Sequence, residues 1–211
     1  MQKVYIFCNN NYSYNNDNFT LDIDLSGIII GSNGGANYLC KKGIIPDVVI
    51  GDFDSIFPEC LDSLKNKSNI IKFPVDKDKS DTELAVEYCV QNGFNNITLI
   101  NAVDGRLDHS LVNIFFIERF IKQGLTFQFL NRENEIFVVT DKIQINAEIG
   151  TIISLISLTD FTLVKKTESL KFPLNNEKLY RSSSRGISNT TTEEKFSITV
   201  TCGILLIIKE R

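Results

Sequence analysis

The first 131 residues alternate short, almost continuous apolar runs with segments that have the hydrophobic spacing of helices. Continuous apolar runs indicate strands buried on both faces, and helices between such strands are typical of a parallel sheet. This half is therefore predicted to be an α/β domain with a parallel, Rossmann-like sheet and helices on both faces. The predicted strands are 3–8, 27–32, 47–53, 69–74, 96–101 and 126–131, and the predicted helices lie within 35–43, 57–67, 80–93 and 108–124.

The pattern changes from about residue 134 onward. Segments such as 135–158 and 195–210 alternate apolar and polar positions and are rich in Ile, Val and Thr, with no helical spacing. Alternation of this kind is typical of strands with one buried face. Residues 132–211 are therefore predicted to form an all-β domain, an antiparallel sandwich or barrel, and 1–131 the α/β domain. No long linker separates them.

Composition narrows the possible partners. The 211 residues include 43% hydrophobic residues, enough for a sizeable core, and the net charge of -4 provides no basic field for nucleic acid or an anionic membrane. The longest apolar runs are too short to span a bilayer. The N-terminal apolar run is followed at once by asparagines, so it is predicted to be a first strand rather than a secretory signal.

The cysteines point to a cytoplasmic protein. There are five of them, at positions 8, 40, 60, 89 and 202, with no CxxC pair. An odd number without metal-type spacing argues against a disulfide framework or a zinc site. We therefore expect reduced, mostly buried thiols.

The stretch "DVVIGDFDSI" (47–56) ends a buried strand with a glycine and two aspartates. If the strand continues, Asp52 and Asp54 share one face, at the edge of a parallel sheet where ligands bind. Two close carboxylates repel unless a cation lies between them, and Mg²⁺ prefers oxygen ligands. Gly51 would allow a close backbone approach. The simpler interpretation is a polar turn with solvated aspartates.

A second polar stretch, "DKDKSDTELAV" (76–86), follows the next strand. Ser80 and Glu83 have the spacing of a capping box, which predicts a helix start there. Asp81 would then lie in the first turn, where a carboxylate is favoured by the helix dipole and can face the same edge of the sheet. It is a candidate third metal ligand.

Two further stretches belong to the same edge. In "NAVDGRLDHSLVN" (101–113), Arg106 offers a planar fork for phosphate oxygens, and Asp108 is predicted to cap the following helix with His109 in its first turn. In "GSNGGANYL" (31–39), a strand runs through glycines into a helix, a weak phosphate-binding signal by itself. Together the four stretches predict Mg²⁺-dependent chemistry on a nucleotide polyphosphate.

These motifs, in this order, closely resemble those of the thiamine pyrophosphokinase family. The residues that carry the resemblance are Gly34-Gly35-Ala36-Asn37, "PDVVIGDFDS" (46–55), "DKDKSD" (76–81), "GRLDH" (105–109) and, more loosely, "LKFPL" (170–174) and "SSRGISN" (183–189). The resemblance covers almost the whole chain, and "GDFDS" with "GRLDH" at this spacing is specific.

The resemblance implies a fold, a reaction and a set of site residues. Family members transfer a pyrophosphoryl group from ATP to the hydroxyl of thiamine, giving thiamine diphosphate and AMP, and are homodimers with thiamine bound between subunits. They combine an α/β nucleotide-binding domain with a β-sandwich domain. Carried over by motif, the implied metal ligands are Asp52, Asp54 and Asp81. The implied ATP and reaction site also includes Asn33, Gly34, Gly35, Lys77, Ser80, Arg106 and Asp108. The implied thiamine site contains Ser188 and Asn189.

The chain departs from the family pattern at two positions. Asn33 stands where the family commonly has Asp; it keeps an oxygen ligand but loses a charge. Lys77 stands where the family often has Gln, which adds a cation that can contact phosphate. The chain has no tryptophan, so ring stacking on thiamine is expected from Phe or Tyr, for example Phe172.

Three other interpretations remain open from the sequence. A Mg²⁺-dependent kinase of another small alcohol would share the metal site and release ADP instead of AMP. A non-catalytic thiamine or nucleotide sensor would be expected to have lost its metal carboxylates, and here Asp52, Asp54 and Asp81 are all present. A purely structural protein would not need charged residues at several strand ends.

Overall fold

The computed structural model describes residues 2–8 and 26–211, and the chain separates into two compact units. Unit 1 is Met1–Arg132 and unit 2 is Glu133–Arg211. The sequence had suggested a division between residues 131 and 132.

Unit 1 contains a parallel sheet, as the continuous apolar runs predicted. Every strand pairing in it is parallel, and the order is β6-β5-β1-β2-β3-β4. The chain moves outward from β1 to β4 and then returns to the other side of β1, which creates a switch point between β1 and β5. The strands are β1 (Lys3–Phe7), β2 (Ile28–Ser32), β3 (Val48–Gly51), β4 (Asn69–Lys72), β5 (Asn96–Ile100) and β6 (Thr126–Leu130).

The Rossmann-like description of this sheet is not confirmed. A dinucleotide-binding sheet of the Rossmann type has equal numbers of strands on the two sides of its switch point. In the described part of unit 1, β1 to β4 lie on one side of that point and only β5 and β6 on the other. What the two arrangements share is the switch point itself.

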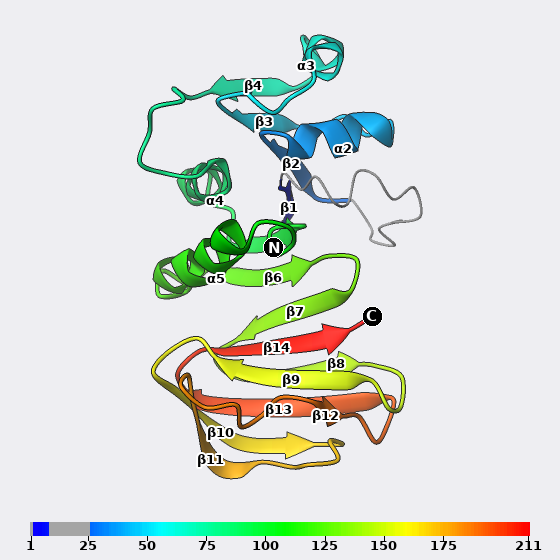
Figure 1. Cartoon of the computed structure of the whole chain (residues 1–211), viewed down its shortest axis with the longest axis vertical. Helices are drawn as coiled ribbons and strands as arrows, with labels where there is room; N and C mark the ends of the chain where they lie inside the picture. The colour runs from blue at the N-terminus through cyan, green and yellow to red at the C-terminus, as the bar shows by residue number, and fades with distance from the viewer. Residues whose placement is uncertain (1, 9–25) are drawn as a thin grey trace. The chain divides into compact units, whose positions relative to one another are not determined.

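Helices cover both faces of this sheet, as predicted (Figure 1). On one face, Tyr5 and Phe7 of β1 pack against Tyr38 and Leu39 of α2. The alternate β1 residues face the other side, where α4 contacts β1, β2 and β3. The helices are α2 (Gly35–Lys41), α3 (Pro58–Leu64), α4 (Asp81–Gln91) and α5 (Leu107–Ile121).

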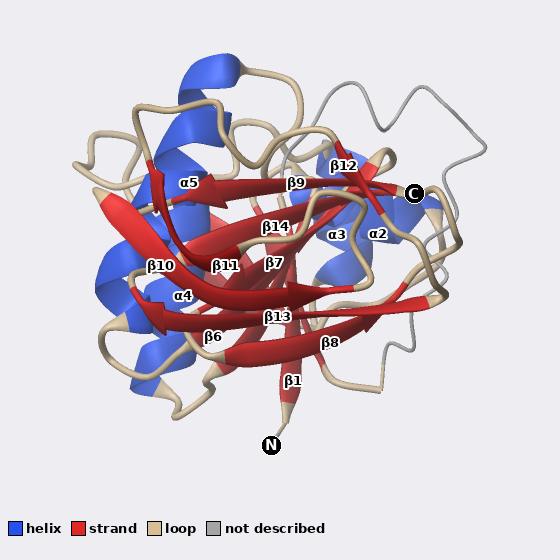
Figure 2. Ribbon diagram, turned by 90° about the horizontal axis from the view of Figure 1, so that it is seen from below, coloured by secondary structure: helices blue, strands red, loops and turns tan. Residues whose placement is uncertain are grey.

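Unit 2 is built from strands alone, and all helices drawn in Figure 2 belong to unit 1. Its strands form two groups, in the orders β12-β9-β14-β7 and β11-β10-β13-β8, and every pairing within them is antiparallel. The strands are β7 (Asn134–Val139), β8 (Lys142–Asn146), β9 (Ile152–Ser157), β10 (Phe161–Glu168), β11 (Asn175–Tyr180), β12 (Asn189–Thr190), β13 (Lys195–Cys202) and β14 (Leu205–Glu210).

The two groups of strands share one apolar core. Leu155 of β9 and Ile207 of β14 come from one group, and Val164 of β10 and Ile198 of β13 come from the other; all four are buried in a single cluster. Two antiparallel sheets that enclose a common core form a sandwich. Of the two alternatives left open by the sequence, the structure therefore has the sandwich.

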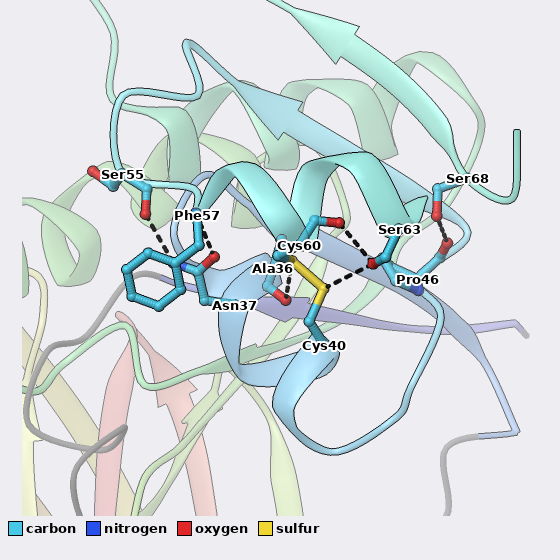
Figure 3. Close-up of a disulfide and its surroundings, with 9 residues drawn as sticks. All are labelled: Ala36, Asn37, Cys40, Pro46, Ser55, Phe57, Cys60, Ser63 and Ser68. Atoms are coloured by element: carbon cyan, nitrogen blue, oxygen red, sulfur yellow. Dashed lines mark hydrogen bonds between the residues drawn. A yellow bond between two sulfur atoms is a disulfide. The ribbon is translucent and has the colours of Figure 1, made fainter. Parts of the chain in front are cut away.

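The expectation of reduced thiols is wrong for one pair of cysteines (Figure 3). Cys40 at the end of α2 and Cys60 in α3 form a disulfide with their Cα atoms 5.9 Å apart. Sequence spacing could not reveal this pair, because α2 and α3 are brought together only by packing on the same face of the sheet. Cys8 and Cys89 are buried thiols outside this disulfide, and burial raises the pKa of each to about 12; Cys202 is an exposed thiol.

Among the described helices, none combines the length and apolar character that crossing a bilayer requires.

Candidate active site

A cavity of about 380 Å³ opens at the carboxyl ends of the unit 1 strands. Its lining includes Cys8 after β1, Asn33 after β2, Asp52 after β3 and Asn101 after β5. These strands surround the switch point between β1 and β5, which is where open α/β sheets bind ligands. The convergence of the motifs on one edge of the sheet is therefore confirmed.

Asp52 and Asp54 reach the cavity by a different route from the one the sequence suggested. Strand β3 ends at Gly51, and Phe53 has a φ of 71°, so the strand does not continue through the two aspartates. Instead, the backbone N–H of Asp54 donates to Oδ1 of Asp52 at 3.2 Å, which closes a tight turn. The turn, and not strand alternation, brings both carboxylates to one place.

Gly51 permits the close approach that the sequence predicted. A Cβ atom at this position would lie 3.0 Å from Cβ of Asn33, and the φ of 155° is one that side chains rarely adopt. The backbone N–H of Asn33 also donates to the carbonyl of Ile50 at 2.7 Å. The ends of β2 and β3 are thus held together directly beneath the carboxylates.

Asn33 lies at the centre of the carboxylates. Its amide Nδ2 is 3.0 Å from Oδ1 of Asp52, 2.9 Å from Oδ1 of Asp54 and 2.8 Å from Oδ2 of Asp81. An amide nitrogen has only two hydrogens, so three acceptors must share them. Asn33 Oδ1 is buried and has no hydrogen-bond partner within the described chain.

Lys77 is the cation of this group. Its Nζ is 2.7 Å from Oδ2 of Asp52 and 3.1 Å from Oδ1 of Asp81, and the three side chains are only 9–16% exposed. Three carboxylates therefore face one ammonium and one amide. We call Asn33, Asp52, Asp54, Lys77 and Asp81 the acidic cluster.

The pKa shifts follow from burial and from these contacts. Burial alone would lower the pKa of Lys77, but the hydrogen bonds and charges of Asp52 and Asp81 raise it above its usual value. Burial would raise the pKa of Asp52, and the Lys77 and Asp54 hydrogen bonds hold it below normal. Burial, reinforced by the charge of Asp52, keeps the pKa of Asp81 above normal. The cluster therefore favours a charged Lys77 beside an ionised Asp52.

Helix α4 positions Asp81 as the capping motif predicted. Ser80 is the N-cap, and its Oγ accepts a hydrogen bond from the N–H of Glu83 at 3.2 Å. The carboxylate of Glu83 pairs with Arg119 of α5 at 2.7 Å. Asp81 is the first residue of the helix, and both Ser80 and Asp81 line the cavity.

The opposite side of the cavity carries Arg106. Its guanidinium makes a two-pronged contact with Asp108, with Nη2 at 2.5 Å from Oδ2 and Nε at 3.1 Å from Oδ1. The Arg106 and Asp108 side chains are 71% and 63% exposed, and the guanidinium lowers the pKa of Asp108 to about 2. We call these two residues the Arg106–Asp108 pair.

The predicted capping role of Asp108 is wrong. Helix α5 begins at Leu107 with Arg106 as the N-cap, so Asp108 already lies in the first turn. Its carboxylate is occupied by the Arg106 side chain. His109 lies in the first turn, as predicted, and lines the cavity; Asp108 is not among the lining residues.

The residues that line the cavity differ in part from those predicted. Gly34 and Gly35 do not line the cavity; Gly35 instead allows α2 to pass close to β1, since a Cβ there would be 1.8 Å from the carbonyl oxygen of Phe7. Asn101 and Thr82 line it and were not proposed. Asn101 has a φ of 58° and a buried, unpartnered Oδ1. An asparagine directly after a strand was the available signal.

The three predicted thiamine residues lie together in unit 2. Asn189 is buried, and its side chain bonds both backbone groups of Phe172, accepting from N–H at 3.0 Å and donating to C=O at 2.7 Å. Phe172 is 53% exposed. Ser188 has a φ of 56°, and its N–H donates to Oγ of Ser154 at 3.0 Å. Asn189 therefore positions the Phe172 loop.

The chemistry of the acidic cluster fits a hard divalent cation. It offers three carboxylates and one unpartnered amide oxygen, and oxygen ligands are those that Mg²⁺ prefers. Yet across residues 2–8 and 26–211, no three carboxylate, imidazole or thiol groups form a ready metal site. The nitrogens of Asn33 and Lys77 lie among the carboxylates instead. A switch-point cavity with acidic residues on one side and an arginine on the other is typical of enzymes that act on polyphosphates.

Comparisons with known proteins identify the enzyme family to which the chain is similar. The thiamin pyrophosphokinase catalytic domain model matches residues 22–129, and the thiamin pyrophosphokinase vitamin B1 binding domain model matches residues 140–205. The chain therefore belongs to the thiamine pyrophosphokinase family.

Individual relatives agree with this assignment. Thiamine pyrophosphokinase from Bacillus subtilis (strain 168) is 26% identical over 183 residues, covering 85% of this chain and 86% of the relative. A crystal structure of thiamine pyrophosphokinase from Bacillus subtilis superposes with a TM-score of 0.83 at 23% identity over 99% of both chains. Thiamin pyrophosphokinase from Candida albicans gives a TM-score of 0.77 at 18% identity, covering 100% of this chain and 89% of the other. At these identities the superpositions establish the fold.

Proposed function

We propose that this protein transfers a pyrophosphoryl group from ATP to the hydroxyl oxygen of thiamine, giving thiamine diphosphate and AMP. The observation that carries the proposal is the pairing of the acidic cluster with Arg106 across one cavity, in a chain of this family. Lys77, Ser80 and Arg106 line that cavity and are proposed to contact the polyphosphate. Contacts from Asn33, Gly34 and Gly35 to ATP stay a prediction.

Asp52, Asp54 and Asp81 are proposed to hold Mg²⁺. Their oxygens all lie within 3.0 Å of one Asn33 nitrogen, so a single small cation is within reach of the three. When bound, the cation would neutralise charge on the polyphosphate. The number of metal ions is left open by this arrangement.

The protein's own groups contribute mainly by position and charge. Attack of the thiamine hydroxyl on the β-phosphorus forms an O–P bond as the hydroxyl releases its proton to solvent. The bond between the β-phosphorus and the oxygen of AMP breaks, so negative charge moves onto that leaving oxygen. Arg106 can stabilise charge on the phosphoryl oxygens through its five N–H donors. The sequence suggested that Asp108 orients the hydroxyl or accepts its proton. A carboxyl whose pKa is about 2 is a poor base, which favours a role in orienting Arg106.

Unit 2 is proposed to bind thiamine. The exposed ring of Phe172 offers a stacking surface for an aromatic cation, and Asn189 fixes the backbone beneath it. Ser188 is adjacent. Phe172→Ala should raise KM for thiamine without changing KM for ATP, and an effect on ATP alone would contradict this assignment.

A homodimer in the cytoplasm stays a prediction. The α5 residues Leu107, Leu111 and Phe115 recur at helical spacing and are 71%, 42% and 53% exposed, which is compatible with a surface covered in an assembly. Light scattering coupled to size-exclusion chromatography measures the oligomeric state directly. A mass of one chain at all concentrations would contradict the dimer.

The test of the proposed function is a product assay. Purified protein is incubated with thiamine, ATP and Mg²⁺, and the nucleotides and thiamine esters are separated. AMP together with thiamine diphosphate, both lost on chelation by EDTA, is the expected result. ADP with thiamine monophosphate would change the reaction to that of a kinase, and binding without turnover would indicate a sensor.

A further inference from the structure

The chain itself places a cation, Lys77, among the carboxylates of the acidic cluster. Lys77 Nζ bridges Asp52 and Asp81 at 2.7 Å and 3.1 Å. A divalent cation bound to both carboxylates would lie close to the ammonium, and the two positive charges would repel. Lys77 and the metal ion therefore compete for the same two carboxylates.

Asn33 adds to this competition. Its Nδ2 donates toward all three carboxylates, while its Oδ1 is buried without a partner. N–H groups that point into the cluster occupy carboxylate lone pairs that a cation would need. Rotation of the amide would turn the unpartnered oxygen toward the carboxylates, an arrangement that is favourable only when a cation lies between them.

After displacement, the Lys77 ammonium can pair with phosphate oxygens in the same cavity. Lys77 lines the same cavity as Arg106 and Ser80. Its four-carbon stem is flexible, and an ammonium is a compact partner for phosphate oxygens. A nucleotide polyphosphate in this cavity would therefore offer Lys77 new anionic partners at the moment that it leaves the carboxylates.

We propose that Lys77 is a built-in counter-cation of the acidic cluster, which a divalent cation displaces and which then pairs with the polyphosphate of the nucleotide. The second part of this inference rests on the proposed function. The consequence is that metal binds weakly to the free protein and tightly together with nucleotide, so that the two ligands favour each other's binding.

The first measurement is Mn²⁺ binding to the nucleotide-free protein, followed by the electron paramagnetic resonance signal of free Mn²⁺. Lys77→Met and Lys77→Gln should bind Mn²⁺ about tenfold more tightly than wild type, because the competing charge is gone. Lys79→Met is the matched control. Lys79 is the same residue type two positions away, but it pairs with Glu87 at 2.8 Å and does not line the cavity.

The second measurement is binding of metal-free ATP in EDTA, by calorimetry. Here the Lys77 variants should bind about tenfold more weakly than wild type, while Lys79→Met should not change. Opposite signs in the two measurements are the signature of the proposal, since a purely structural role of Lys77 would weaken both. The two Lys77 variants differ in polarity, so the test survives if one of them fails to fold.

Thermal melting gives an independent check of the same competition. The Lys77 variants leave Asp52 and Asp81 without their cation, so Mn²⁺ should raise their Tm more than that of wild type. Mn²⁺ affinity that is unchanged or weaker in both Lys77 variants, or undetectable in every protein, would overturn the proposal. None of these readouts depends on turnover. A negative pyrophosphokinase assay would therefore contradict the proposed function without deciding whether Lys77 competes with metal.

Discussion

The two sides of the cavity in unit 1 are built in contrasting ways. The acidic cluster comes from the ends of β2 and β3, from the loop after β4 and from the start of α4. Apart from the exposed Asp54, its side chains are largely shielded from solvent, and its carboxylates contact Asn33 and Lys77. The Arg106–Asp108 pair comes from positions two residues apart at the start of one helix, and both side chains are more than 60% exposed. The difference separates two kinds of functional residue. Changes at the shielded residues of the acidic cluster should affect folding and metal binding together, whereas changes in the Arg106–Asp108 pair should affect catalysis alone.

The largest effect is expected at Asp54, the exposed carboxylate of the acidic cluster. Asp54→Ala removes one of the three carboxylates and should lower turnover by on the order of 10³-fold, as when a principal electrostatic group is lost. The fold should persist, because removing one of three like charges also relieves repulsion. Asp62→Ala is the control, since Asp62 is an exposed carboxylate paired with Lys65. Product assays and circular dichroism measure both effects; turnover within about tenfold of wild type would contradict the cluster's role.

The next largest effect, on the free energy of unfolding, is expected at the disulfide between α2 and α3. Asn37 of α2 donates to the carbonyl of Ser55 at 2.8 Å and accepts from the N–H of Phe57 at 2.9 Å, and the Cys40–Cys60 disulfide joins α2 to α3 (Figure 3). Cys60→Ser should lower the free energy of unfolding by about 3 kcal/mol, because the unfolded chain loses a constraint.

A dithiol distinguishes this effect from loss of packing. Reduction should bring wild type down to the stability of Cys60→Ser and leave the variant unchanged, as measured by urea denaturation. Cys202→Ser, at an exposed free thiol, should match wild type throughout. Equal stability of wild type and Cys60→Ser in the absence of reductant would contradict the predicted role of the disulfide.

The exposed side should behave differently. Arg106→Ala should lower turnover by about 10²-fold, since an unpaired phosphoryl charge remains, with no change in the free energy of unfolding. Arg106→Lys should recover only part of the loss, because Lys lacks the planar fork. Arg181→Ala, at an exposed arginine paired with Asp160 at 2.8 Å, should leave turnover unchanged. A drop in stability as large as that of a cluster variant would remove the contrast between the two sides.

Substitution of Asn33 tests whether metal binding at the acidic cluster changes the free energy of unfolding. Asn33→Ala leaves three carboxylates without their shared donor and should cost about 2 kcal/mol of unfolding free energy without metal. Part of that cost is the φ of 47°, which Asn tolerates better than Ala. Asn66→Ala, at an exposed asparagine with a φ of 67°, measures the backbone part alone. The difference between the two variants should shrink as Mg²⁺ is added; a difference that is independent of Mg²⁺ would count against the link.

The smallest effect is expected at Asp108. Asp108→Asn should lower turnover by less than about tenfold, because the amide can still orient Arg106. Since Arg106 holds the pKa of Asp108 at about 2, the carboxylate stays ionised until the pH falls through that value. The pH profile of kcat near neutrality should therefore have the same shape in both proteins. Loss in the variant of the acidic limb, the fall in kcat at low pH, would instead identify Asp108 as the proton acceptor.

Much of this architecture could be predicted from local sequence. The strands of unit 1 and its helices follow from apolar runs, glycines such as Gly93 and Gly124, and the cap at Ser80, all of which act over a few residues. The alternation in the second half predicted antiparallel strands for the same reason. The site residues could be proposed because parallel strands end at one edge, so that position in the sequence implies proximity in space.

What the sequence could not determine is the set of side-chain and backbone contacts that forms when the chain folds. The turn at Phe53, the disulfide between Cys40 and Cys60, and the pairing of Arg106 with Asp108 each replaced a reasonable local expectation. The most consequential case is the acidic cluster. The sequence placed Asn33 and Lys77 near the carboxylates, but only the tertiary structure puts both nitrogens among them. Burial decides this outcome, because carboxylates withdrawn from water must find donors and cations within the chain.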